Sequence, residues 1–258
     1  MDLGLQGKTA LVTGGSKGIG LACAKALASE GARMAICSRS RINVDAALAE
    51  LPGAFGVTAD LRSAGEAGKV VETVWRELGR LDILVTSAGA ATRTPPHELS
   101  PDAWREAMDN KYFSYINVID PMVKKMAARG AGVVVNIIGA GGKVAAPTHL
   151  AGGAANAALM LATVGLANAY AGQGLRIVGL NPGLTHTGRV RDAMRAVAAD
   201  QGISEEEALR RNTAAIPMGR LADPEEIASV VAFLCSTQAS YLTGVVVSMD
   251  GASVPTVV

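Results

Sequence analysis

The sequence predicts an α/β fold, a doubly wound parallel sheet in a single domain, and two observations support this. Short apolar runs alternate with stretches of helical periodicity from near the beginning of the chain to near its end. A glycine-rich segment, residues 13–20, directly follows the first apolar run and opens the first helical stretch. The 258 residues are enough for one large domain of this class.

The strands of a parallel sheet are covered on both faces, so they are expected as continuous apolar runs. Such runs occur at Thr9–Val12, Arg33–Cys37, Ala54–Thr58, Ile83–Thr86, Val133–Ile138, Arg176–Leu180 and Val245–Ser248. Helical periodicity between them predicts helices at Ile19–Ser29, Ala64–Leu78, Pro101–Ala128, Ala154–Tyr170 and Pro224–Leu234. Right-handed strand–helix–strand crossovers would then place helices on both faces of the sheet.

The alternation has one long interruption, at about residues 183–221. Connections of this length are commonly functional lids, so we expect a flap that covers the substrate. An anionic substrate group would suit the arginines of this segment, which are Arg189, Arg191, Arg195, Arg210 and Arg211. Solvated charges on ordinary amphipathic helices are the commoner origin of such a pattern.

Composition and charge exclude several classes of partner. The 24 basic and 23 acidic residues leave a net charge of +1, which gives no general attraction to nucleic acid or to an anionic membrane. No apolar run approaches the roughly 20 residues of a membrane span, and residues 1–8 lack the features of a secretory signal. We therefore expect a cytoplasmic location. Three scattered cysteines, Cys23, Cys37 and Cys235, predict buried reduced thiols and no metal site.

The glycine-rich segment has the physical properties of a phosphate-binding loop. Because it joins a strand to a helix, its backbone N–H groups and the positive end of the helix dipole would face a phosphate. Its glycines allow the backbone to approach the ligand closely. We expect a bound dinucleotide in contact with Gly14, Ser16, Lys17, Gly18, Ile19 and Gly20.

The end of the second predicted strand discriminates between NAD and NADP. An acidic residue there would bind the ribose hydroxyls of NAD, but this chain has Ser38 followed by Arg39. The guanidinium of Arg39 suits the additional phosphate of NADP, and Lys17 adds a second cation beside the same pocket. The alternative is that both are solvated surface charges. The sequence favours NADP(H) over NAD(H).

Motifs along nearly the whole chain resemble those of the short-chain dehydrogenase/reductase family. Matches in the first half are the glycine loop, Asp60-Leu61 at the adenine, Ser87-Ala88-Gly89 for the usual Asn-Ala-Gly, and Asn110 for the catalytic Asn. Matches in the second half are Asn181-Pro182-Gly183 with Thr185 and Thr187 at the nicotinamide, Asp223-Pro224-Glu225-Glu226-Ile227, Tyr241-Leu242-Thr243-Gly244 and Asp250-Gly251. The resemblance implies a seven-stranded Rossmann-type sheet, a nicotinamide cofactor and a homo-oligomer, either a tetramer or a dimer.

The resemblance fails at the residues that carry the family's chemistry. In the family a Ser polarises the substrate carbonyl, a Tyr transfers the proton, and a Lys four residues later lowers the pKa of that Tyr. Alignment from residues 133–137 places these roles on Gly139, Gly152 and Asn156. No shift of register restores the pair, because no lysine lies four residues after any of Tyr112, Tyr115, Tyr170 and Tyr241.

Polar residues near these positions could replace part of the lost chemistry. Asn156 could bond a ribose hydroxyl, although it has no charge with which to activate a phenol. If the helix extends back to His149, its imidazole falls on the face of Gly152 and could donate a proton in the vacated space. The alternative is that His149 is an exposed loop residue. Lys143 and Thr148 are weaker candidates of the same kind.

Three functions agree with these observations. The working hypothesis is an NADP-dependent oxidoreductase that transfers hydride between nicotinamide and a small carbonyl or alcohol, with Asn110, His149 and Asn156 as catalytic residues. The proton would pass through His149, through water ordered by Asn110, or through the substrate itself. The alternatives are a nucleotide-binding sensor or partner subunit without turnover, and a non-redox lyase or dehydratase. The fold alone does not choose among them.

Overall fold

Seven parallel strands form one sheet in the order β3-β2-β1-β4-β5-β6-β7, as the sequence predicts. The computed structural model describes residues 2–89 and 91–256. The strands are β1 (Thr9–Thr13), β2 (Arg33–Ser38), β3 (Phe55–Thr58), β4 (Ile83–Thr86), β5 (Gly132–Ile137), β6 (Leu175–Pro182) and β7 (Val246–Met249). The strand order reverses between β1 and β4, and sheets of this kind bind ligands at that point, beyond the carboxyl ends of the strands.

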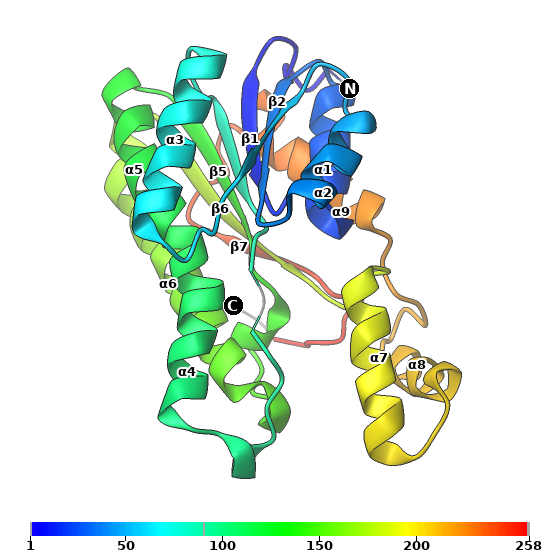
Figure 1. The fold of residues 1–258 in the computed structure, drawn as a ribbon. Coiled ribbons are helices and arrows are strands. Elements are labelled where there is room, and N and C mark those ends of the chain that lie inside the picture. Colours follow the sequence, from blue (N-terminus) through cyan, green and yellow to red (C-terminus); the bar gives the residue numbers. More distant parts are fainter. Residues whose placement is uncertain (1, 90, 257–258) are drawn as a thin grey trace.

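Helices cover both faces of the sheet (Figure 1). One face carries α1 (Gly18–Ser29), α2 (Arg41–Ala49) and α9 (Pro224–Cys235). The other carries α3 (Ala64–Leu78), α5 (Ser114–Arg129) and α6 (Leu150–Tyr170). Every residue of β1 is buried between the two layers. The three cysteines are buried free thiols, in agreement with the prediction.

The strand register brings the loops of the site to one level. Thr13, the last residue of β1, pairs with Cys37 of β2 and with Thr86 of β4. Thr86 in turn pairs with Asn136 of β5. The segments that follow β1, β2, β4 and β5 therefore start at the same edge of the sheet, which we call the carboxyl edge.

Two helix predictions differ from the structure. The helix expected over Pro101–Ala128 is divided into α4 (Pro101–Ala107), a π-helical segment (Met108–Phe113) and α5. A π-helical turn inserts an extra residue into the helical repeat, and such turns are frequent at functional sites. The helix α2 is absent from the prediction; its N-cap, Ser40, accepts a hydrogen bond from the Asn43 N–H.

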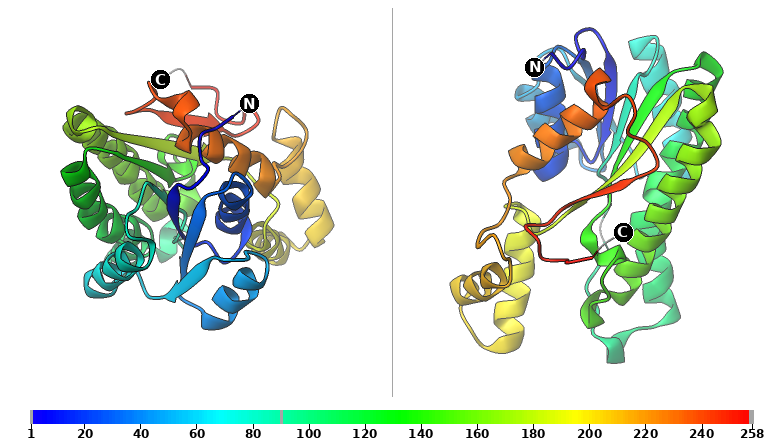
Figure 2. Two further views of the ribbon diagram at one scale, coloured as in Figure 1. Left: turned by 90° about the horizontal axis from the view of Figure 1, so that it is seen from above. Right: turned by 180° about the vertical axis from the view of Figure 1, so that it is seen from behind.

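The flap at residues 183–221 is a pair of helices and not one long loop. It contains α7 (Gly188–Gln201) and α8 (Glu205–Ala214), which lie beyond the carboxyl edge (Figures 1 and 2). Met194, Ala198 and Ala208 form a small apolar core between them. The capping Ser204 and three acidic residues in the first turn stabilise the start of α8.

One helical stretch, residues 147–173, is long and apolar enough to cross a membrane by length and composition alone. Core helices of globular proteins meet the same criterion, and α6, which forms most of this stretch, packs against β6. Its outer face leaves Leu161 and Val164 exposed.

Candidate active site at the carboxyl edge

The loop between β1 and α1 has the geometry of a dinucleotide site. The N-cap of α1, Lys17, makes no side-chain capping hydrogen bond, so the first N–H groups of the helix stay available to an anion. Gly14 has φ +67°, and a Cβ atom there would lie 2.7 Å from the Ser87 carbonyl oxygen. From the other side, Thr187 Cγ2 lies 3.2 Å from the position of a Cβ on Gly18. The segments after β4 and β6 therefore flank the loop.

Two cations stand beside this loop without a carboxylate partner. Arg39, directly after β2, and Lys17 are exposed, and neither forms an ion pair with a residue that the structure describes. By contrast, Arg41 pairs with Asp45 at 2.9 Å. The guanidinium of Arg39 and the ammonium of Lys17 are thus free to bind a phosphate group. Ser38, at the end of β2, is half-buried.

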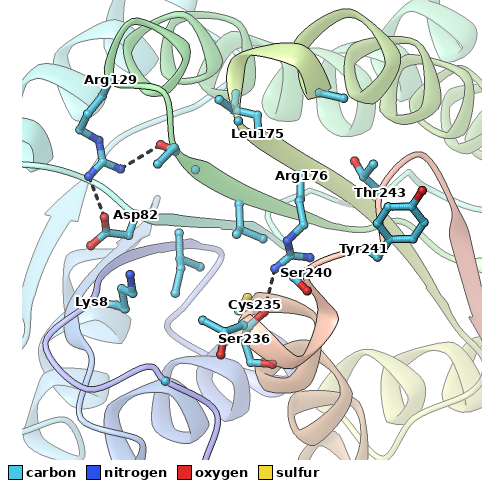
Figure 3. A pocket seen from close by; sticks show the side chains of 18 residues that line it. Lys8, Asp82, Arg129, Leu175, Arg176, Cys235, Ser236, Ser240, Tyr241 and Thr243 are labelled. Carbon is cyan, nitrogen blue, oxygen red and sulfur yellow. Dashed lines mark hydrogen bonds and ion pairs between the residues drawn. The ribbon is translucent and has the colours of Figure 1, made fainter.

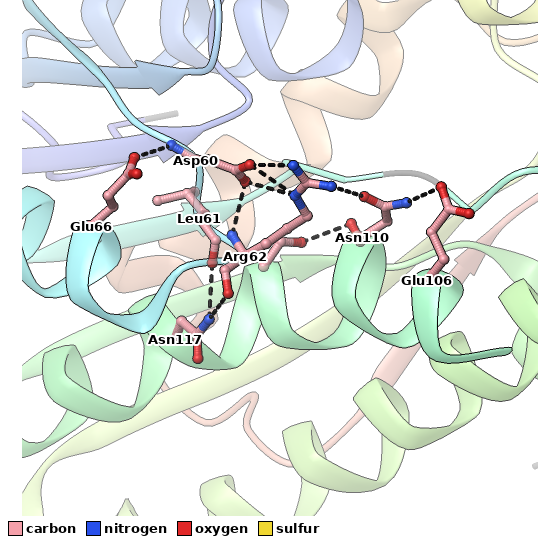
Figure 4. Close-up of polar contacts among 8 residues, drawn as sticks. Asp60, Leu61, Arg62, Glu66, Glu106, Asn110 and Asn117 are labelled. Carbon is pink, nitrogen blue, oxygen red and sulfur yellow. Dashed lines mark hydrogen bonds and ion pairs between the residues drawn. The ribbon is translucent and has the colours of Figure 1, made fainter. Parts of the chain in front are cut away.

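Asp60 and Asn110 belong to one polar network at the surface (Figure 4). Arg62 Nε donates to both carboxylate oxygens of Asp60, at 3.0 and 2.8 Å, and this contact lowers the pKa of Asp60. Arg62 also donates to Asn110 Oδ1 at 3.5 Å, and Asn110 Nδ2 donates to Glu106 at 3.2 Å. The side chain of Asn110 is thus engaged with Arg62 and Glu106. Leu61, between the two charged residues, is buried.

The segments after β4 and β6 are held by backbone contacts. The Ser87 N–H donates to the Thr13 carbonyl, and Ser114 Oγ lies 3.4 Å from the Ala88 carbonyl oxygen. Arg189, at the start of α7, reaches back to the Gly89 carbonyl oxygen at 3.4 Å. After β6, Pro182 is followed by the turn in which the buried Thr185 donates to the Gly183 carbonyl at 3.1 Å. Arg189 therefore links the flap to the carboxyl edge.

The imidazole of His149 fills the space over Gly152. His149 is the N-cap of α6 with φ −131° and ψ 26°, so the helix does not extend back to it. A Cβ atom on Gly152 would nevertheless lie 2.2 Å from His149 Cε1, and one on Gly141 would lie 2.8 Å from His149 Cδ2. The ring thus occupies the room that a side chain at position 152 would need. Gly139 has φ +122°, a conformation that other L residues rarely adopt.

Two buried polar atoms beside these glycines have no hydrogen-bond partner among the described residues. They are Nδ1 of His149 and Oδ1 of Asn156, and Asn156 is only 5% exposed. Unpaired buried polar atoms are rare in folded proteins and each calls for a ligand, a water or a function. Burial lowers the pKa of His149, and the charges of Arg93 and Lys111 lower it further.

Sequence reasoning missed Lys111, which is buried in the π-helical segment. Its ammonium lies 2.9 Å from the Tyr115 hydroxyl and 3.3 Å from the Ile137 carbonyl oxygen at the end of β5. Burial, helped by the charge of Arg189, lowers the pKa of Lys111 to about 7, and burial raises the pKa of Tyr115. The sequence signal for this pair is a lysine four residues before a tyrosine, directly after Asn110. The family's catalytic pair has the opposite order, with the lysine four residues after the tyrosine.

The remaining candidates have other partners. Lys143 donates to Ser248 Oγ at 3.3 Å, and Arg93 contacts Thr148 Oγ1 at 3.5 Å. Most of the flap arginines pair with flap carboxylates: Arg195 with Asp192 and Glu205, and Arg210 and Arg211 with Glu207. No group of three or more His, Cys, Asp or Glu side chains suited to a metal ion occurs in the part of the chain that the structure describes.

A cavity of about 740 Å³ lies at the opposite, amino edge of the sheet (Figure 3). Its two arginines, Arg129 and Arg176, already have partners. Arg176 donates to the carbonyl oxygens of Leu234, Ser236 and Leu242, and Arg129 pairs with Asp82 at 2.8 Å. The size of this cavity does not make it the reaction site, because the unpaired polar groups and the phosphate-binding loop are at the carboxyl edge.

Known proteins resemble this chain along nearly its whole length. Residues 14–252 match the enoyl-(acyl carrier protein) reductase family. An A-factor type γ-butyrolactone 1′-reductase of Streptomyces virginiae is 34% identical over 96% of this chain and 95% of its own. A D-threitol dehydrogenase of Mycolicibacterium smegmatis is 32% identical over 97% of this chain and 94% of its own.

A solved structure shows the same architecture. L-sorbose reductase from Gluconobacter frateurii, complexed with NADPH and L-sorbose, superimposes with a TM-score of 0.94 at 28% identity over the whole of both chains. The likeness covers the sheet, both helical layers and the flap. The fold, the glycine loop and these relatives together identify the chain as a member of the short-chain dehydrogenase/reductase family and an oxidoreductase of that type.

Proposed function

We propose that the chain is an NADP(H)-dependent oxidoreductase that acts without the family's Ser, Tyr and Lys, with His149 as its proton-transfer group. The observation that carries this proposal is the position of the His149 imidazole over Gly152, with a buried Nδ1 that has no partner. An imidazole that titrates near neutrality can both donate and accept a proton. The vacated tyrosine position therefore holds a group of the right chemistry.

The site residues also fit a nicotinamide dinucleotide. The first turn of α1 and Gly14 would hold the pyrophosphate, and the unpartnered Oδ1 of Asn156 would accept a hydrogen bond from a ribose hydroxyl. The bound cofactor would supply the hydride, which is its own chemistry. The chain would position the cofactor and the substrate and supply a proton at His149. Gly139, which stands at the family's Ser position, has no hydroxyl to polarise a carbonyl.

The protonation state of His149 sets the direction of proton transfer. Reduction of a carbonyl requires the imidazolium as donor, whereas oxidation of an alcohol requires the neutral imidazole as acceptor. Because the pKa of His149 is lowered, reduction weakens as the pH rises through that lowered pKa, and oxidation strengthens.

We infer NADP(H) as the preferred cofactor from Arg39 and Lys17, which form no ion pair with a residue that the structure describes. The test is a fluorescence titration of the wild-type chain and Arg39→Ala with NADPH and NADH. We expect NADPH affinity to fall about 30-fold or more and NADH affinity to change less than about threefold, because a charge-assisted pair with the phosphate is lost. Arg41→Ala, which breaks only the surface pair with Asp45, is the matched control.

Two results would contradict the proposal. An equal loss for NADPH and NADH in Arg39→Ala would remove the preference for NADP(H). Failure of the wild-type chain to bind either nucleotide would remove the assignment of the glycine loop itself.

We also propose a homo-oligomer with a small-molecule substrate. The exposed apolar residues Leu161 and Val164 on α6, at 76% and 41% exposure, support burial of this face against a second copy. An anionic substrate has less support, because three of the five flap arginines pair with flap carboxylates.

A further inference from the structure

We propose that Lys111 is a positioning residue that controls the protonation of His149, so that the buried ammonium and the half-buried imidazole compete for one proton. The proposal rests on the proposed function only for the role of His149 as proton-transfer group. The assignment follows from the burial of Lys111, from its uncharged partners and from its place between β5 and α6.

Lys111 is an unusual core residue. Its side chain is 7% exposed, yet its hydrogen-bond partners, the Tyr115 hydroxyl and the Ile137 carbonyl, are both uncharged. No carboxylate among the described residues forms an ion pair with it, although fifteen other ion pairs form elsewhere in that part of the chain. A buried ammonium without a counter-charge costs several kcal/mol, and an apolar side chain of the same size would avoid that penalty. A role in the site would explain the lysine.

The charged side chains that act on Lys111 and on His149 are positive. The π-helical segment packs against the first turns of α6, and His149 lies directly before that helix. Arg189 acts on Lys111 from the start of α7, and Arg93 acts on His149 from the segment after β4. On α5 the neighbouring titratable group is Tyr115, which stays a neutral phenol because burial raises its pKa. None of these groups carries a negative charge that would stabilise Lys111 and His149 when both are protonated.

Lys111 and His149 therefore influence one another. Lys111 donates to the Ile137 carbonyl oxygen and the His149 ring lies beside Gly141, so both side chains reach the segment at the end of β5. The charge of Lys111 lowers the pKa of His149, and linkage requires the reverse effect of equal size. Burial lowers the pKa of Lys111 to about 7 and also lowers the pKa of His149, so the protonation of each group affects that of the other. A protonated Lys111 would disfavour the protonated form of His149, and a neutral Lys111 would favour it.

The test is an NMR titration of the imidazole Cε1–H signals in the wild-type chain and in Lys111→Met, at fixed salt. The chain has three histidines, and His97 and His186 are exposed, so they serve as internal references. We expect the pKa of His149 to rise by about 0.5 to 1 in Lys111→Met, because a nearby positive charge has been removed. The signals of His97 and His186 should not differ between the two proteins.

Lys143→Met is the matched control. Lys143 is a lysine of the same region that bonds Ser248 and does not affect the pKa of His149. An unchanged His149 titration in Lys111→Met, or an equal rise in both variants, would overturn the proposal. Lys111→Gln, which removes the charge and keeps a polar side chain, is the second variant should methionine disturb the packing. Since the readout needs no turnover, a chain that never oxidises NADPH would still show the coupling.

A second readout is the pH dependence of unfolding. The folded-state pKa of Lys111, about 7, lies below the ordinary 10.5, so the unfolded chain binds the additional proton between these values. Wild-type stability should therefore rise relative to Lys111→Met by up to about 1.4 kcal/mol per pH unit from pH 7 towards pH 10. The same pH dependence in both proteins would show that Lys111 keeps its ordinary pKa, and would contradict the proposal.

Discussion

The amino and carboxyl edges of the sheet differ in how many of their polar groups have hydrogen-bond or ion-pair partners. At the amino edge, the carboxylate of Asp82 accepts hydrogen bonds from Thr9, Arg80 and Arg129, and the half-buried Arg176 donates to carbonyl oxygens. Among the described residues at the carboxyl edge, Lys111 forms no ion pair, and His149 and Asn156 each have a buried atom without a hydrogen-bond partner.

This difference indicates that the polar groups of the amino edge stabilise the fold, whereas those of the carboxyl edge serve the function. A buried polar group with all its hydrogen bonds stabilises the fold, whereas one without them lowers stability and persists where a ligand or a proton completes it. The amino edge, although it holds a cavity of about 740 Å³, connects β1, β4 and β5 structurally. The carboxyl edge keeps buried polar atoms that have no partner among the described residues, as we expect of a reaction site.

Among the variants that test this difference between the edges, we expect Asp82→Ala to have the largest effect, a loss of folding stability. Burial raises the pKa of Asp82, but hydrogen bonds from Arg129, Thr9 and Arg80 outweigh it and lower the pKa to about 2. Loss of these bonds should destabilise the fold by about 2 to 3 kcal/mol in urea unfolding at pH 7. The deficit should be present above about pH 4 and disappear as the pH falls towards 2, while the dissociation constant of NADPH stays unchanged.

Asp120→Ala is the control for this prediction. Asp120 forms an exposed pair with Lys124 on α5, so its loss should change stability by less than about 0.5 kcal/mol. If Asp82→Ala weakened NADPH binding more than it weakened the fold, the amino edge would belong to the functional site and the contrast would be wrong.

A smaller effect is expected from Gly152→Ala at the carboxyl edge. The new Cβ atom would lie 2.2 Å from His149 Cε1 and 2.8 Å from Ala91 Cβ, so the imidazole must move. We expect hydride transfer from NADPH to slow about tenfold, with NADPH affinity unchanged within about threefold.

Gly165→Ala lies on the same helix in open space, so it should leave the rate unchanged and add up to about 1 kcal/mol of stability. Stopped-flow single turnovers and urea unfolding of both variants provide the measurement. An unaltered rate in Gly152→Ala would mean that the placement of His149 has no part in the chemistry.

The sheet was predictable because its strands are buried on both faces. The limits of β4, Ile83–Thr86, and of α3, Ala64–Leu78, agree with the sequence prediction residue for residue. The ends of a continuous apolar run and of a strongly amphipathic helix can be recognised from the sequence pattern itself. The helices α7 and α8 were missed because they bury little apolar surface and their charges hide the helical repeat.

The candidate site was predictable only in part. The cofactor loop and the cations beside it follow from local sequence, and the structure brings them to one edge. The position of the His149 ring could not be foreseen, because it depends on a non-helical backbone at the N-cap of α6. Lys111 was overlooked because a lysine within a helical stretch is expected on the surface, and burial is decided by tertiary packing.

The most direct test of the proposed function is single-turnover hydride transfer from bound NADPH to a panel of carbonyl compounds, for the wild-type chain and His149→Ala. We predict that the wild type oxidises NADPH with at least one carbonyl and slows as the pH rises through the lowered pKa of His149. His149→Ala should lose about 100-fold in rate and this pH dependence. Tight NADPH binding without oxidation by the wild type, or an unchanged rate and pH profile in His149→Ala, would contradict it.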